Sequence, residues 1–158
     1  MSYFDYDEFK RLKDSVNIEY KNTGHVYSPA LKAKIVFNSN GITHLYYKNN
    51  RTGRSKNVQY NKLRFFREAV NISKIATTIQ EYRRIALSNK CKNGQNKISV
   101  TELFAFWAII SFKKKTRIKI IVRRVGGDDG QYHFWSLMPY WNLRHKDRVI
   151  GSQDIENE

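Results

Sequence analysis

Three consecutive strand-like runs in the second half of the sequence constrain the fold of this chain most. They cover residues 98–112, 116–125 and 131–138 and are rich in β-branched and aromatic residues, which favour strands. The segments that link them, 113–115 and 126–130, are short enough for hairpin turns, and the second contains three glycines. The sequence therefore predicts an antiparallel β-meander.

The first half of the sequence predicts helices and one strand. Apolar residues recur every three to five positions over 3–21, which indicates an amphipathic helix, whereas 31–37 alternates like a half-buried strand. Further helices are expected over 42–49, 58–69 and 72–85. Helices followed by a meander indicate the α+β class, with the N-terminal helices packed on one face of an antiparallel sheet.

Length and composition predict a single domain with a true core. The chain has 158 residues, of which 41% are hydrophobic and 14% aromatic. We expect one basic domain over 1–141 and a charged flexible tail over 142–158. No apolar run is long enough to span a membrane and the charged N-terminus lacks a signal core, so a cytoplasmic location is expected.

Charge gives the clearest indication of function. The formal net charge is +15, and residues 20–127 contain 23 Lys or Arg against only three acidic residues, Glu68, Glu81 and Glu102. Such an excess is typical of a surface that binds a polyanion. We therefore expect a nucleic-acid partner, RNA rather than DNA. The alternative is a solvated surface that serves only solubility.

Two clusters of residues are candidates for chemistry, and the first lies around the predicted helix 42–49. His44 and Lys48 are four residues apart, so they share one helix face. The following basic loop adds Arg51, Arg54 and Lys56 as candidate phosphate ligands. A histidine at this position is as often a capping or surface residue as a functional one.

The second cluster lies in the predicted meander. Arg117, Lys119 and Arg123 alternate with apolar residues and are expected on one sheet face, whereas alternation allows only one of Arg123 and Arg124 to face that side. The next strand carries His133 and Ser136. A sheet with one apolar face and one basic face is a suitable platform for a nucleic-acid strand. His133 could also be a packed strand residue.

The residues that are absent from the sequence narrow the possible chemistry. There is no phosphate-binding Gly-rich motif, the central chain has too few acidic residues for a catalytic carboxylate pair, and one cysteine and four scattered histidines remain, so we expect no metal and no cofactor. The remaining residue types suit a metal-independent ribonuclease. Histidine can deprotonate the ribose 2′-OH or protonate the leaving 5′-oxygen, and Arg and Lys stabilise the charge on the phosphate.

Four segments of the sequence can be compared with a known family: VFNSNGITHLYYK, IQEYRR, VRRVGG and YHFWSLMPYW. Through them, residues 37–141 resemble the phage-type nucleases of the Barnase–EndoU–colicin E5/D–RelE superfamily. The resemblance implies N-terminal helices followed by a four-stranded antiparallel sheet. The resemblance implies a toxin-like or phage-effector-like endoribonuclease that forms 2′,3′-cyclic phosphate ends, and an acidic antitoxin or immunity protein as its inhibitor. It also implies a catalytic set of His44, Lys48, Arg123, His133 and Ser136, with His44 as the general base or acid.

Two other functions remain open from the sequence. One is a non-catalytic module that binds nucleic acid through the basic sheet face. The other is an inhibitor protein whose basic face docks onto an acidic protein.

Overall fold

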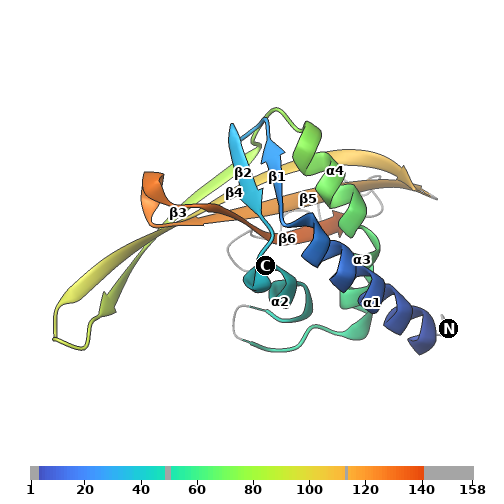
Figure 1. Cartoon of the computed structure of the whole chain (residues 1–158), viewed down its shortest axis with the longest axis horizontal. Helices are drawn as coiled ribbons and strands as arrows, with labels where there is room; N and C mark the ends of the chain where they lie inside the picture. Colours follow the sequence, from blue (N-terminus) through green and yellow to red (C-terminus); the bar gives the residue numbers. More distant parts are fainter. Residues whose placement is uncertain (1–3, 49–50, 113, 141–158) are drawn as a thin grey trace.

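The structure, a computed structural model, describes residues 4–48, 51–112 and 114–140. Its elements, in chain order, are α1 (Tyr6–Thr23), β1 (His25–Ser28), β2 (Ala33–Val36), α2 (Ser39–Tyr46), α3 (Lys56–Arg64), α4 (Phe66–Ile75), β3 (Glu81–Lys90), β4 (Asn96–Phe112), β5 (Lys114–Val125), a 3₁₀ turn (Gly127–Asp129) and β6 (Tyr132–Tyr140). The helices lie against a long twisted sheet (Figure 1). The α+β class is confirmed. None of the described helices is long and apolar enough to cross a membrane.

The sheet has six strands in the order β1-β2-β6-β5-β4-β3. The predicted meander is present as the antiparallel neighbours β4, β5 and β6. The expected four-stranded, purely antiparallel sheet is wrong, because β2 pairs with β6 in parallel and two further strands form the edges. The edge strand β1 was not predicted, since its four residues are too few to show a periodicity.

The helix predicted over 72–85 is also wrong in its second half. The helix α4 ends at Ile75, and residues 81–90 form β3, which pairs with β4 along its whole length. Apolar residues at 79, 82 and 85 have helical spacing, but Tyr82 packs on Phe104 of β4, with ring centroids 5.1 Å apart. Pairing with β4 therefore determines the conformation of this segment.

The central strands are buried on both faces. Ile118, Ile120 and Val122 of β5 belong to the main core beneath the helices. On the other face, Ile121 belongs to a second apolar cluster, whose buried members are Leu103, Ala105, Ile121, Met138 and Tyr140. This second face, which the sequence predicts to be an open basic platform, therefore has an apolar centre.

One end of the β3–β4 ladder extends beyond the rest of the sheet. The β4–β5 pairing stops at Thr101 opposite Val125, whereas β3 and β4 remain paired as far as Lys90 and Asn96. Residues 86–100 thus form a two-stranded arm that projects from the body (Figure 1, yellow-green). The predicted tail over 142–158 lies outside the described residues.

Candidate functional site

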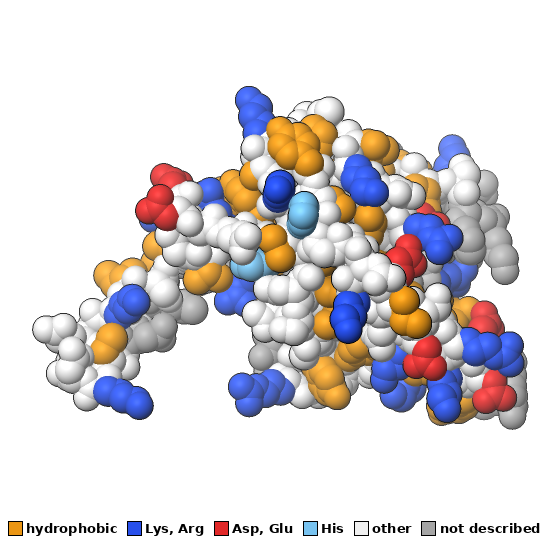
Figure 2. Space-filling view, viewed as in Figure 1, with side chains coloured by type: hydrophobic (Ala, Val, Ile, Leu, Met, Phe, Trp, Pro, Cys, Tyr) orange, Lys and Arg blue, Asp and Glu red, His pale blue; other side chains and the backbone are white. Residues whose placement is uncertain are grey.

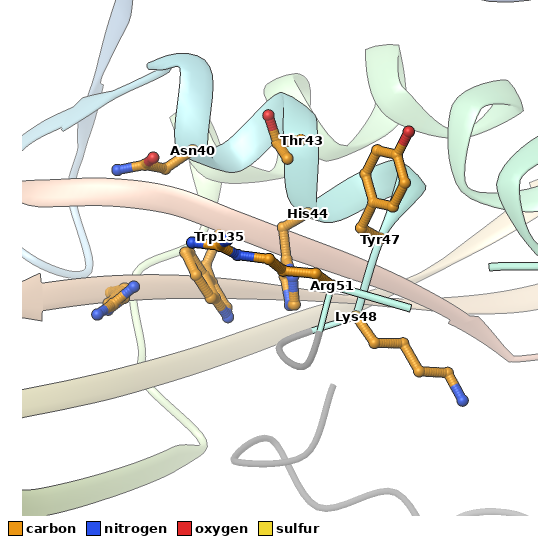
Figure 3. Close-up of a pocket in the computed structure, with 8 residues that line it drawn as sticks. Asn40, Thr43, His44, Tyr47, Lys48, Arg51 and Trp135 are labelled. Atoms are coloured by element: carbon orange, nitrogen blue, oxygen red, sulfur yellow. The ribbon is translucent and has the colours of Figure 1, made fainter. Parts of the chain in front are cut away.

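A cavity of about 460 Å³ lies where α2 meets β5 and β6 (Figure 3). Its lining residues come from α2 and the following turn, from β5 and from β6: Asn40, Thr43, His44, Tyr47, Lys48, Arg51, Arg123 and Trp135. The structure therefore brings together four of the predicted site residues, His44, Lys48, Arg51 and Arg123. They are separated by up to 79 residues in the sequence.

Close packing of α2 on β6 positions His44. The Asn38 side chain caps the helix by accepting a hydrogen bond from the Gly41 N–H at 3.3 Å. A side chain at Gly41 would collide with the Phe134 carbonyl and the Tyr20 hydroxyl, so glycine allows the helix to approach the strand directly. The imidazole of His44 is consequently buried at the base of the cavity, with 4% of the residue exposed.

A β-bulge places Trp135 in the cavity. Val122 pairs with Phe134 and Ile121 with Ser136, so Trp135 is the extra residue in β6 and has no partner on β5. Bulges commonly redirect a side chain in this way. The Trp135 indole stacks on the His44 imidazole, with centroids 4.2 Å apart and planes inclined by 28°. The Arg123 guanidinium also lies over the indole, 4.5 Å from its centre.

The cavity has a cationic lining. Burial lowers the pKa of Arg123 from its ordinary value, although a guanidinium stays charged at neutral pH. Lys48 and Arg51 are exposed at the rim, in a turn where the Arg51 N–H donates to the Lys48 carbonyl at 2.9 Å. No Asp or Glu is among the described lining residues. An anion is the ligand that such a lining favours.

His133 lies beside the cavity but does not line it. It pairs with Arg123 across the β5–β6 ladder, and its Nδ1 lies 2.9 Å from the Asn38 amide nitrogen. Burial, and to a lesser degree the charge of Arg123, lowers the pKa of His133. A neutral imidazole can accept the hydrogen bond from Asn38 at Nδ1. His133 therefore supports the residue that caps α2.

Ser136 is buried below the cavity and is not among its lining residues. Its hydroxyl accepts a hydrogen bond from Nζ of Lys62 at 3.2 Å. The same ammonium group donates to the Leu137 carbonyl at 2.7 Å. This arrangement joins α3 to β6 inside the protein, so Ser136 is placed to support the fold rather than to touch a ligand.

The remaining candidates from the basic loop have different surroundings. Arg54 is buried, and its Nε donates to the His44 carbonyl at 3.2 Å. Arg54 therefore supports the last turn of α2 from within the protein. Lys56 is exposed at the start of α3, where its Nζ lies 5.4 Å from the centre of the Phe9 ring.

The sheet cations Arg117, Lys119 and Arg124 lie outside the cavity. Lys119 is 2% exposed and forms an ion pair with Glu81 at 2.6 Å, and Arg117 packs on the Trp107 and Tyr140 rings. Arg124 lies on the face opposite Arg123 and pairs with Glu102 at 2.7 Å. Lys119 and Arg124 thus pair with carboxylates of the protein, and Arg117 packs on two aromatic rings. Among the cations of the described strands, Arg123 alone lines the cavity.

Sequence reasoning missed four of the lining residues: Asn40, Thr43, Tyr47 and Trp135. Helical spacing could have identified Asn40 and Thr43, which lie four and one residues before His44 on α2, whereas Tyr47 lies just beyond the end of that helix (Figure 3). Trp135 could not be identified, because the bulge that redirects it is not visible in the alternation of its strand.

Among the described residues, no group of three or more His, Cys, Asp or Glu side chains could hold a metal ion. Searches with the sequence and the structure find no matching family model, curated protein or solved structure.

Proposed function

We propose that this protein is a metal-independent RNA endonuclease whose active site is the cavity between α2, β5 and β6. The observation that carries the proposal is the convergence of one imidazole and three cationic side chains on a single cavity without a carboxylate among its described lining residues. Attack by the ribose 2′-OH on the adjacent phosphorus, yielding a 2′,3′-cyclic phosphate, requires only proton transfer and stabilisation of phosphate charge.

The imidazole and the three cationic side chains that line the cavity each suit one part of this reaction. His44 is the candidate for proton transfer, as general base or acid. Arg123, held against Trp135 at the wall, supplies a guanidinium that can bind two phosphate oxygens. Lys48 and Arg51 at the rim attract the neighbouring phosphates of the strand. His133, Ser136 and Arg54 support the elements that carry these groups.

The second candidate function is a non-catalytic RNA-binding module. It is favoured by the stacking of His44 on Trp135 inside the protein, because a buried, stacked imidazole can serve packing alone. An acidic inhibitor protein is a compatible partner in either case, since its carboxylates would complement the same cations.

Incubation with total RNA and with a defined oligonucleotide, in excess EDTA, tests the proposal. We expect fragments with 2′,3′-cyclic phosphate ends, no cleavage of the matching DNA, and at least a 100-fold lower rate for His44→Ala and Arg123→Ala. His25→Ala is the matched control, because His25 is exposed on β1 and does not line the cavity. RNA binding without cleavage by the wild-type protein would instead support the non-catalytic module.

A further inference from the structure

The two-stranded arm, residues 86–100, has no counterpart in the proposed catalytic chemistry. Its two strands pair with each other beyond the end of β5, which lies opposite Thr101, and at its base the Gly126 N–H donates to the Val100 carbonyl at 2.9 Å. Most of its described side chains are exposed, including Ile98 at 69%. A two-stranded ribbon of this kind gains little stability on its own. Core packing therefore does not explain why the chain forms this arm.

The charged residues of the arm itself are all basic: Lys90, Lys92 and Lys97. Between Glu81 and Glu102 the sequence has no acidic residue and five basic ones, Arg83, Arg84, Lys90, Lys92 and Lys97. All five are exposed, and the lysines gather near the tip of the arm. Lys and Arg side chains stand out from the arm in the space-filling view (Figure 2). Like charges at this density repel one another unless a polyanion neutralises them.

The sheet register connects the arm to the cavity. Arg123 pairs with Leu103, and Leu103 pairs with Arg83, so the two arginines lie on one face of the sheet. Adjacent strands are about 4.8 Å apart, which puts the backbones of Arg83 and Arg123 roughly 10 Å from each other. The arm begins three residues beyond Arg83. Arg83 thus lies between the cavity wall and the arm, and the lysines of the arm lie farther out, near its tip.

We infer that the arm binds the phosphate backbone of the RNA segment next to the phosphodiester held in the cavity; this inference rests on the proposed function. The first strand of the arm, residues 86–90, is about 17 Å long, since it has five residues. About five consecutive phosphates of a helical RNA strand cover the same length. The lysines of the arm thus contact phosphates that the cavity does not reach. Short RNAs that fill only the cavity do not use them.

Binding of fluorescent RNAs of 5 and 20 nucleotides, measured by anisotropy over a series of salt concentrations, tests the inference. The triple variant Lys90→Gln, Lys92→Gln, Lys97→Gln is compared with a control, Lys10→Gln, Lys21→Gln, Lys74→Gln, whose lysines are exposed on α1 and α4. We expect the arm variant to bind the 20-mer at least 10-fold more weakly and with a log–log salt slope reduced by about 2. The 5-mer should bind equally to all three proteins.

The outcomes separate the two proposals. An arm variant that binds the 20-mer with the wild-type slope overturns the inference, even if the wild-type protein cleaves RNA. A loss confined to the arm variant supports the inference, even if no protein cleaves RNA and the endonuclease proposal fails. Equal losses in the arm and control variants also overturn the inference, since they indicate only a dependence on net charge. Unchanged thermal unfolding of both variants confirms that the fold is intact.

Discussion

The indole of Trp135 stacks on the imidazole of His44, with centroids 4.2 Å apart, and so joins β6 to α2. The same indole lies under the guanidinium of Arg123. One aromatic side chain therefore sets the positions of the two groups to which we assign proton transfer and phosphate binding.

Replacing Trp135 should affect catalysis according to whether an aromatic face is kept. Aromatic stacking contributes about 0.5–1.5 kcal/mol, so we expect Trp135→Leu to lower the rate of RNA cleavage up to about 10-fold, whereas Trp135→Phe stays near the wild-type rate. Cleavage of a fluorogenic RNA in EDTA measures both. Trp107→Leu is the control, because Trp107 packs on Arg117 outside the cavity. Equal effects of all three substitutions would contradict the role of stacking.

Arg54 and Arg51 should behave differently although they are three residues apart. Arg54 donates to the His44 carbonyl from a buried position, so Arg54→Ala should lower the free energy of unfolding by about 2 kcal/mol and reduce cleavage as well. Arg51 is exposed at the rim, so Arg51→Ala should leave stability within about 0.5 kcal/mol and reduce the salt slope of RNA binding by about 0.7. Urea unfolding and anisotropy titrations distinguish these effects. If Arg51→Ala lost stability and Arg54→Ala did not, the structural role of Arg54 and the binding role of Arg51 would both be refuted.

Lys119 should prove dispensable for RNA binding. It is buried and paired with Glu81, so Glu81→Gln leaves an ammonium group without its partner and should cost about 2 kcal/mol of stability, a figure lowered to allow for the partial exposure of Glu81. Lys119→Met removes the buried charge and leaves only the partly exposed Glu81 carboxylate, which water can solvate, so it should cost less stability than Glu81→Gln. Thermal unfolding and RNA affinity check both variants. Weaker RNA binding by Lys119→Met would restore the phosphate-binding role predicted from the sequence.

His133 should make the protein less stable in mild acid. Its pKa in the folded protein is lowered by burial and by Arg123, so the unfolded chain takes up the proton first as the pH falls. The stability contributed by the neutral imidazole is fully present above its ordinary pKa of about 6.5 and is lost below it. We expect the stability of His133→Asn to decrease less than that of the wild type between pH 7 and pH 5. The exposed His25→Asn should follow the wild-type curve.

Much of the fold could be predicted from local patterns, and the exceptions have physical causes. The cap at Asn38 and the apolar alternation in β5 are properties of a few neighbouring residues, and both α2 and the meander follow from them. Residues 81–85 of β3 were predicted as helix because their conformation depends on pairing with residues 101–105 of β4, which come 16 to 24 residues later. Long-range pairing of this kind leaves no local signal.

The site was predictable to a similar extent. The spacing of His44 and Lys48 predicted one helix face for both, which is wrong for Lys48, because α2 ends at Tyr46 and Lys48 lies in the turn that follows; both residues nevertheless line the cavity. The residue types of Ser136, Arg54 and Lys119 suggested phosphate binding, but their contacts with Lys62, the His44 carbonyl and Glu81 are inside the protein. Sequence identifies such cations and hydroxyls without indicating which of them are buried.

The parallel pairing of β2 with β6 determines when the cavity can exist during biosynthesis. Ile35 pairs with Tyr132, so β2 can join the rest of the sheet through β6 only after β6 has been made. A ribosome-bound chain that ends before β6 lacks both Trp135 and the strand on which α2 packs. Contacts between residues so distant in sequence also form slowly. An enzyme built in this way would stay inactive towards RNA near the ribosome until its last strand had been translated.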